Sequence, residues 1–158
     1  MNEWQALREA VEIGARSPCA KSKRGVVVWA PHLGVTAWGH NTPPRGFGCD
    51  GSDACRAACG KVCVHAEQAA ILSGLLAQNH VAQMEMLHVK VVDGEGVPGG
   101  PPSCPDCSKL ILAVGIAGMW LYEEREGGPQ LVRYTAEEFH RTTLANCGLP
   151  QGKRGQPG

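Results

Sequence analysis

The sequence lacks an excess of charge of either sign, has few aromatic residues, and contains no long apolar run. Its 15 Lys and Arg residues balance its 15 Asp and Glu residues, whereas a dedicated nucleic-acid binder usually shows a basic excess or stripe. No run is long enough to cross a membrane, and residues 1–16 have the pattern of a charged amphipathic helix rather than a secretory signal. We therefore expect a cytoplasmic protein without membrane attachment, and nucleic acid is not the favoured partner.

Cysteine, by contrast, is abundant, with eight residues. Because no signal peptide is seen, a secreted disulfide scaffold is not favoured, and the clustering of cysteines near histidine indicates metal ligation. A chain of 158 residues can bury a full core without such cross-links. We expect one domain over residues 1–148, followed by a disordered tail at 149–158 that is rich in Pro, Gly, Lys and Arg.

The chemistry of the sequence is concentrated in a His65-x-Glu67 pattern and, some forty residues later, a Cys104-x-x-Cys107 pattern. Two thiolates and one imidazole give Zn²⁺ three protein ligands and leave its fourth position for water, whose pKa the metal lowers. Glu67 is close enough to His65 to reach that water and to carry protons without being a ligand. The alternative is a pair of unrelated helix starts, one of them with a redox-active cysteine pair.

The second pattern is also suited to the start of a helix. Cys104 and Cys107 are three residues apart, so on a helix they face the same way. Pro105 is favourable at the first helical position, and the positive end of the helix dipole favours thiolate over thiol. The spacing therefore predicts two adjacent metal-binding thiolates.

Periodicity and turn residues predict a mixed α/β order. Helices are expected at residues 2–15, 64–78, 104–114 and 135–146, the last opened by a Thr135–Glu138 capping box. Strands are expected at 25–30 and 35–39, as a hairpin, and at 86–92, 119–122 and 131–134. Residues 40–62 and 93–102 are predicted to be functional loops. This order favours a mixed sheet of about five strands with helices on both faces.

The zinc patterns, together with Ser17-Pro18-Cys19 before the first strand and Trp38 to Pro44 after the second, resemble the cytidine deaminase superfamily. The similarity covers roughly residues 17–123 and is greatest to the deoxycytidylate (dCMP) deaminase family. It implies a cytidine deaminase-like three-layer α/β/α fold and a homo-oligomer. It also implies hydrolytic deamination of a cytosine-bearing nucleotide, dCMP to dUMP being favoured. Two positions depart from the family pattern: Ser103 stands where the family has Pro, and Ala69 where it has Asn.

The same resemblance implies roles for individual residues. Glu67 would be the catalytic proton shuttle, with His65, Cys104 and Cys107 as ligands of the catalytic zinc. Asn41 would touch the sugar of a small-molecule nucleotide, and the loop holding Arg45 would lie near its phosphate. Ala66 and Ser103 would lie at the substrate pocket.

Five further cysteines are candidates for a second, structural zinc. Cys55, Cys59 and Cys63 are spaced four apart and would share a helical face, with Cys49 just upstream. Cys19 lies where some deoxycytidylate deaminases place a ligand of such a zinc. Four of these five thiolates would close a tetrahedral structural site. The alternative is that they are small buried residues, as free cysteines often are.

Two other functions remain open. One is a polynucleotide-editing deaminase acting on single-stranded DNA or tRNA, which would need a basic and aromatic surface to hold the strand. The other is a non-catalytic zinc-binding interaction module, against which Glu67 counts because a structural site needs no proton carrier. The basic residues Lys21, Lys23 and Arg24 are interpreted as a solvated loop. His40 and His88 are candidates for extra metal ligands, but a lone histidine is more often a loop or surface residue, and this interpretation is favoured for both.

Overall fold

The structure is a computed structural model that describes residues 1–74 and 81–151. Its helices are α1 (Glu3–Ala15), α2 (Asp53–Val62), α3 (Ala66–Ser73), α4 (Pro105–Val114) and α5 (Ala136–Asn146). Its strands are β1 (Lys23–Ala30), β2 (Gly34–His40), β3 (Glu85–Val92), β4 (Glu95–Val97), β5 (Gly118–Arg125) and β6 (Gly128–Thr135). Residues 75–78 of one predicted helix and 152–158 of the predicted tail lie outside the described residues. No helix in the described ranges is both long and apolar enough to span a membrane.

The strands form one mixed sheet in the order β2-β1-β3-β5-β6, and β4 pairs with the end of β3. The pairs β1–β2, β1–β3 and β5–β6 are antiparallel, while β3 and β5 run parallel from Glu85–Gly118 to His88–Leu121. A parallel pair needs a crossover connection, and the segment containing α4 supplies it. The predicted fold class, an α/β fold with a mixed sheet covered on both faces, is confirmed.

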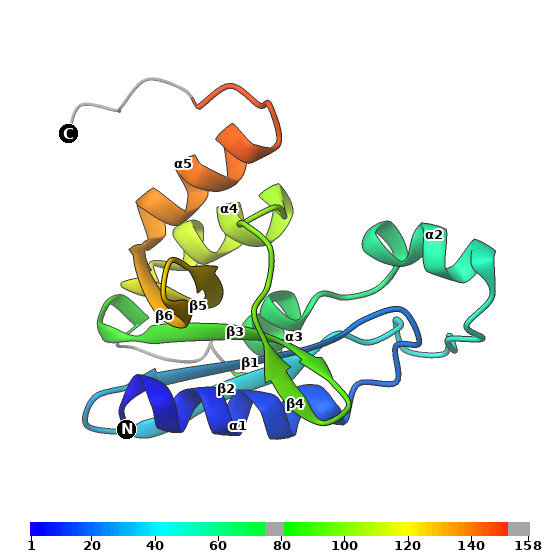
Figure 1. Cartoon of the computed structure of the whole chain (residues 1–158), viewed down its shortest axis with the longest axis horizontal. Helices are drawn as coiled ribbons and strands as arrows, with labels where there is room; N and C mark the ends of the chain where they lie inside the picture. Colours follow the sequence, from blue (N-terminus) through cyan, green and yellow to red (C-terminus); the bar gives the residue numbers. More distant parts are fainter. Residues whose placement is uncertain (75–80, 152–158) are drawn as a thin grey trace.

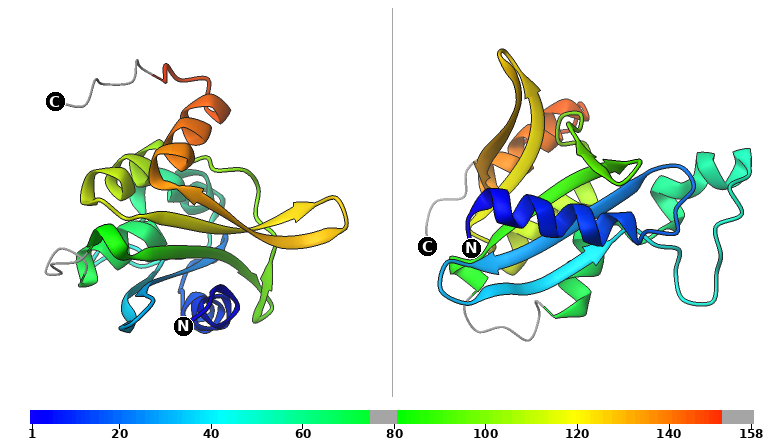
Figure 2. Two further views of the ribbon diagram at one scale, coloured as in Figure 1. Left: turned by 90° about the vertical axis from the view of Figure 1, so that its left-hand side faces the viewer. Right: turned by 60° about the horizontal axis from the view of Figure 1, so that its bottom comes forward.

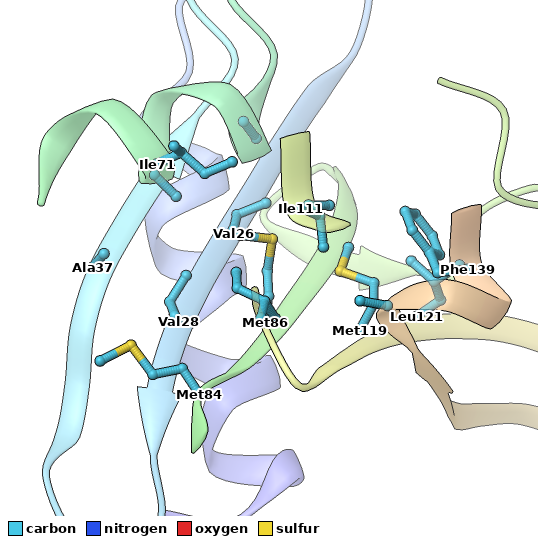
Figure 3. Packing of buried hydrophobic residues seen from close by; sticks show 14 of the residues in the cluster. Val26, Val28, Ala37, Ile71, Met84, Met86, Ile111, Met119, Leu121 and Phe139 are labelled. Atoms are coloured by element: carbon cyan, nitrogen blue, oxygen red, sulfur yellow. The ribbon is translucent and has the colours of Figure 1, made fainter. Parts of the chain in front are cut away.

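Helices cover the sheet on both faces, with α1 on one side and α3, α4 and α5 on the other (Figures 1 and 2). Under α1 lie Val27, Trp29, Leu87, Val89 and Val91, which pack against Ala6, Ala10 and Ile13. On the opposite face, Ile71, Ile111 and Phe139 from the three helices pack with Val26, Met86 and Met119 (Figure 3). Successive side chains of β1 and β3 therefore lie alternately in two separate cores, one on each face of the sheet.

The structure corrects both predicted loops. Residues 53–62 of the first form α2, whose N-cap Ser52 accepts a hydrogen bond from the Cys55 backbone N–H. None of the α2 residues is buried, and the helix projects from the body of the molecule (Figure 1). Residues 95–97 of the second loop form β4. In the absence of buried apolar residues, the hydrophobic periodicity used for prediction could not find α2.

The strands β5 and β6 are also longer than predicted, and they pair as a hairpin. The two strands pair from Gly118–Thr135 to Arg125–Gly128, and both Gly127 and Gly128 have positive φ. Such angles suit glycine and a tight turn. The Gly-Gly dipeptide was therefore a usable signal for a hairpin. The predicted strands, at 119–122 and 131–134, stop short of this turn on both sides.

Gly39 fixes the distance between β2 and α3, the helix that begins directly after His65. A Cβ at Gly39 would clash with the backbone of α3 at Ala66 O and Ala70 N. Backbone atoms cannot rotate aside, so Gly39→Ala is expected to displace α3 and lower the free energy of unfolding by about 1–3 kcal/mol. Urea unfolding measures this loss. Gly48→Ala is the control, because a Cβ at Gly48 meets nothing within 4 Å. Equal stability of the two variants would contradict the proposed close approach.

Candidate metal centre and active-site cavity

Three predicted metal ligands lie together where the N-termini of α3 and α4 meet. The Nδ1 atom of His65 is 3.2 Å from Sγ of Cys104 and 3.2 Å from Sγ of Cys107, and the two sulfur atoms are 3.1 Å apart. His65 is the N-cap of α3, and Cys104 is the N-cap of α4 with Pro105 at the first helical position. In the part of the chain that the structure describes, this is the single group of three or more potential ligands placed closely enough to hold a metal ion.

The donor set fits zinc. Two thiolates and one imidazole are ligands that Zn²⁺ prefers, and three protein ligands are typical of a catalytic rather than a structural site. Around a tetrahedral zinc with ordinary bond lengths, donor atoms are separated by about 3.6–3.8 Å. The observed separations of 3.1–3.2 Å are slightly shorter, so a small outward movement of the three side chains would accommodate the ion.

The backbone of α2 orients the His65 ring. Nε2 of His65 is 3.1 Å from the carbonyl oxygen of Gly60, which lies in the last turn of α2, where carbonyl groups have no helical partner. Nε2 therefore carries the proton and donates it to Gly60, which leaves the Nδ1 lone pair for a metal. Hydrogen bonds of this kind commonly fix the tautomer of a metal-binding histidine. This role of Gly60 was not predicted, because it depends on α2.

Without a metal, the three ligands share protons unequally. A hydrogen bond with Cys107, opposed by burial and aided by His65, lowers the pKa of Cys104 to about 5. The hydrogen bond with Cys104 raises the pKa of His65 to about 9, against the effect of burial. The pKa of Cys107 lies far above its ordinary value because of Cys104 and burial. Cys104 is therefore already a thiolate at neutral pH, while the other two ligands must lose a proton to a metal.

Glu67 lies in the first turn of α3 and is 6% exposed. Burial would raise the pKa of its carboxyl, but His88, its own backbone N–H, His65 and Arg24 together outweigh burial and hold that pKa below its ordinary value. Glu67 is thus an ionised carboxylate at neutral pH, able to accept a proton. Its Oε1 atom is 3.2 Å from Nδ1 of His88. Burial lowers the pKa of His88, against the opposing effect of the Glu67 carboxylate.

These residues line one cavity of about 400 Å³. Of the predicted substrate-binding residues, Asn41, Ala66 and Ser103 are in its wall, whereas Arg45 is not. The cationic side chains of the wall are Lys21 and Arg24, and their place at the cavity corrects their interpretation as a solvated loop. Its apolar part includes Leu121 and Phe139. The cavity therefore combines a metal-ligand group, a buried carboxylate, an apolar patch and a cationic border.

Asn41 holds the cationic border in place. Its Oδ1 atom accepts a hydrogen bond of 2.7 Å from the backbone N–H of Arg24, and its Nδ2 atom donates one of 2.7 Å to the carbonyl oxygen of Ser22. Arg24 itself is half-buried, and its Nε donates to Oγ of Ser22. Burial lowers the pKa of Arg24 and Glu67 raises it, yet a guanidinium stays charged in proteins. Asn41 thus orders the loop that carries this charge.

Five of the other six cysteines fall into two sets. Sγ of Cys59 is 3.5 Å from Sγ of Cys19 and 3.6 Å from Sγ of Cys63. Sγ of Cys49 is 3.6 Å from Sγ of Cys55. Within the described residues these sulfur atoms do not gather into a group of three that could share one ion. Cys147 is exposed, and its Sγ atom donates to the carbonyl oxygen of Ser103 at 3.4 Å.

The chain has the fold of known nucleoside and nucleotide deaminases. It is 22% identical to dCMP deaminase from the cyanophage S-TIM5, with a TM-score of 0.57 over 80% of this chain and 89% of that one. It is 17% identical to cytidine deaminase from Burkholderia pseudomallei, with a TM-score of 0.59 over 88% of this chain and 96% of that one. Cytidine deaminase from Mycobacterium tuberculosis is 16% identical, with a TM-score of 0.50 over 82% and 90%. No protein-family model and no curated protein sequence matches the chain.

Proposed function

We propose that the protein is a zinc-dependent hydrolase that removes the amino group of a cytosine-bearing nucleotide, most favourably converting dCMP to dUMP. The observation that carries this proposal is the placement of a His65/Cys104/Cys107 donor group and the buried carboxylate of Glu67 in one cavity. A structural zinc site is closed by four protein ligands and needs no proton carrier. An open three-ligand site beside an ionised carboxylate suits hydrolysis.

His65, Cys104 and Cys107 would hold the zinc, which supplies a Lewis acid that lowers the pKa of water. Glu67 then acts as the proton carrier of the cavity. Its carboxylate accepts one proton from water and passes it to the ring nitrogen N3 as the hydroxyl adds at C4. It then takes the proton of that hydroxyl and passes it to the amino group, which leaves as ammonia. Burial favours this role because a carboxylate screened from bulk water exchanges protons with the substrate rather than with solvent. The net reaction consumes one water and releases one ammonia for each cytosine converted to uracil.

The cationic border of the cavity supports a phosphate-bearing substrate. Within the described residues, the Arg24 guanidinium makes its one side-chain hydrogen bond through Nε, so its terminal nitrogen atoms can donate to a ligand. Lys21 adds a second positive charge on the same border. A guanidinium forms paired hydrogen bonds with phosphate oxygens. We therefore assign phosphate recognition to Arg24 and Lys21 rather than to the loop of Arg45.

Ammonia release by the zinc-loaded protein tests the proposal. The substrates are cytosine, deoxycytidine, CMP, dCMP, dCTP and a cytosine-containing single-stranded oligonucleotide. Turnover of a mononucleotide, dCMP above the others, is the expected result. Turnover of the oligonucleotide alone would replace it with polynucleotide editing. Inactivity on every substrate, in protein shown to contain zinc, would favour a non-catalytic zinc-binding module.

Replacing Arg24 with Gln is expected to raise the KM for dCMP by about 10- to 100-fold while changing the KM for deoxycytidine little. A hydrogen bond to a charged group contributes about 1.5–3 kcal/mol, and deoxycytidine has no phosphate to make one. Steady-state kinetics with the two substrates measures the difference. Arg45→Gln is the matched control and should leave both KM values unchanged. Equal loss on both substrates in Arg24→Gln would remove Arg24 from phosphate recognition.

The second, structural zinc stays a prediction. A tetrahedral site would need the Cys19/Cys59/Cys63 set and the Cys49/Cys55 set to supply four sulfur atoms to one ion. Sulfur pairs at 3.5–3.6 Å are close to the spacing expected for two thiolates on one zinc, which supports the idea. The number of zinc ions bound per chain, in the wild-type protein and in Cys104→Ala, decides whether this structural site exists.

A further inference from the structure

His88 is an imidazole where the sheet otherwise places apolar side chains. It lies in the central strand β3, paired with Val26 of β1 and Leu121 of β5, and both of these neighbours are core residues. Met86, two residues earlier on the same face, is fully buried in that core. A valine or methionine at position 88 would continue the core without burying a polar ring. The imidazole therefore requires an explanation other than packing.

One ring nitrogen of His88 contacts Glu67, and the other has no partner in the part of the chain that the structure describes. Its Nδ1 atom is 3.2 Å from Oε1 of Glu67, while its buried Nε2 atom has no hydrogen-bond partner within the described residues. An ionised carboxylate can only accept hydrogen bonds, so Nδ1 must carry the proton and donate it. Buried polar atoms without a partner are rare in proteins. The ring is thus held with one nitrogen unsatisfied and the other directed at the carboxylate.

Glu67 also lines the cavity together with the metal-ligand group His65, Cys104 and Cys107. The contact with His88 therefore orients a carboxylate that shares its cavity with the metal-ligand group. A proton carrier must be held within a fraction of an ångström of its working position to be effective. His88 lies in a strand that is hydrogen-bonded to β1 on one side and to β5 on the other.

We propose that His88 is a positioning residue, whose Nδ1–H group holds the Glu67 carboxylate in the orientation needed for proton transfer. The inference rests on the proposed deamination for the role of Glu67. It involves no change in the protonation of either side chain. In this proposal only Nδ1 of His88 donates a hydrogen bond, and Nε2 has no role. The two ring nitrogen atoms can therefore be tested separately.

Three substitutions use that distinction. In His88→Asn the side-chain amide nitrogen can take the place of Nδ1, whereas in His88→Gln the amide takes the place of Nε2. His88→Leu removes both nitrogens. We expect Leu and Gln to lower kcat for the preferred substrate by about 10- to 100-fold with KM within about twofold. Asn should restore kcat to within a few-fold of the wild-type value. Zinc content should be the same in all four proteins.

A second measurement does not depend on turnover. The ¹⁵N NMR shifts of the His88 ring, in zinc-loaded protein, distinguish a proton on Nδ1 from one on Nε2. A proton on Nδ1 is the expected result, and a proton on Nε2 would overturn the inference even if the Leu variant failed to fold. If the wild-type protein turns over a nucleotide but His88→Leu and His88→Gln are equally active, the positioning role fails alone. If the wild-type protein turns over nothing, the proposed function fails, and the NMR result still decides how Glu67 is held.

Discussion

Replacing Glu67 with Gln is expected to lower kcat by about 10²- to 10⁴-fold, the range typical of a lost general acid–base group. Gln has the size of Glu but cannot accept a proton at its amide. Because the pKa of Glu67 is held below its ordinary value, the wild-type carboxylate stays ionised throughout the neutral range, and the variant should be impaired at every pH there. Ammonia release and KM for dCMP measure the effect, with KM expected to change little.

A matched control is Glu123→Gln. Glu123 is another buried glutamate, 8% exposed, which pairs with Arg125 and accepts a hydrogen bond from Tyr134 outside the metal-bearing cavity. Its replacement should reduce stability and leave kcat unchanged. Full activity in Glu67→Gln would exclude the proposed mechanism. A large loss of activity in both variants would indicate that the loss in Glu67→Gln comes from damage to the fold rather than from lost proton transfer.

Replacing Cys104 with Ala is expected to remove one zinc ion per chain and to lower activity by more than about 100-fold. Substitutions in the outer shell of a metal site already cost about 10- to 100-fold, and this change deletes a ligand. Cys104 is also the one ligand of the three that is a thiolate at neutral pH before metal binding, because its pKa is lowered to about 5. Elemental analysis of zinc and ammonia release are measured on the same sample. Thermal unfolding should show a lower Tm, because bound zinc stabilises the folded state.

Cys147→Ser is the control for this variant, since Cys147 is exposed, belongs to neither cysteine set, and can be replaced by a hydroxyl that keeps its hydrogen bond to the Ser103 carbonyl oxygen. It should retain zinc and activity. The zinc count also decides the structural site: two ions in the wild-type protein and one in Cys104→Ala support it, while one and none exclude it. Unchanged zinc and activity in Cys104→Ala would contradict the assignment of the metal centre.

Several features were predictable because they depend on residues close together in sequence. The start of α4 at Pro105, with Cys104 as its N-cap, follows from local preferences. The Thr135–Glu138 capping box forms as predicted, with both of its hydrogen bonds present. The hairpin of β1 and β2 is confirmed as well. Residues within one turn of a helix, or across a tight turn, meet in almost any fold that contains them.

Other features were missed because their signals are weak in isolation. The charged residue Arg24 follows two other basic residues, a pattern usually seen in solvated loops, and nothing local shows that Asn41 binds its backbone. His88 was interpreted as a loop or surface residue, since a single histidine in a short strand gives no indication of its neighbours. In α1, the aromatic residue Trp4 is 48% exposed, and the small residues Ala6 and Ala10 are buried instead.

The sequence alone determined the chemistry of the site: the donor types, their spacing within each motif, and the presence of an acidic residue beside the histidine. The tertiary structure alone decided which residues surround them. Parallel pairing of β3 with β5 places α3 and α4 on one face of the sheet, so that their N-termini meet. The same register places His88 against Glu67. The physical reason is range: capping and spacing act over three or four residues, whereas strand register joins segments far apart along the chain, where burial of the whole core selects the arrangement.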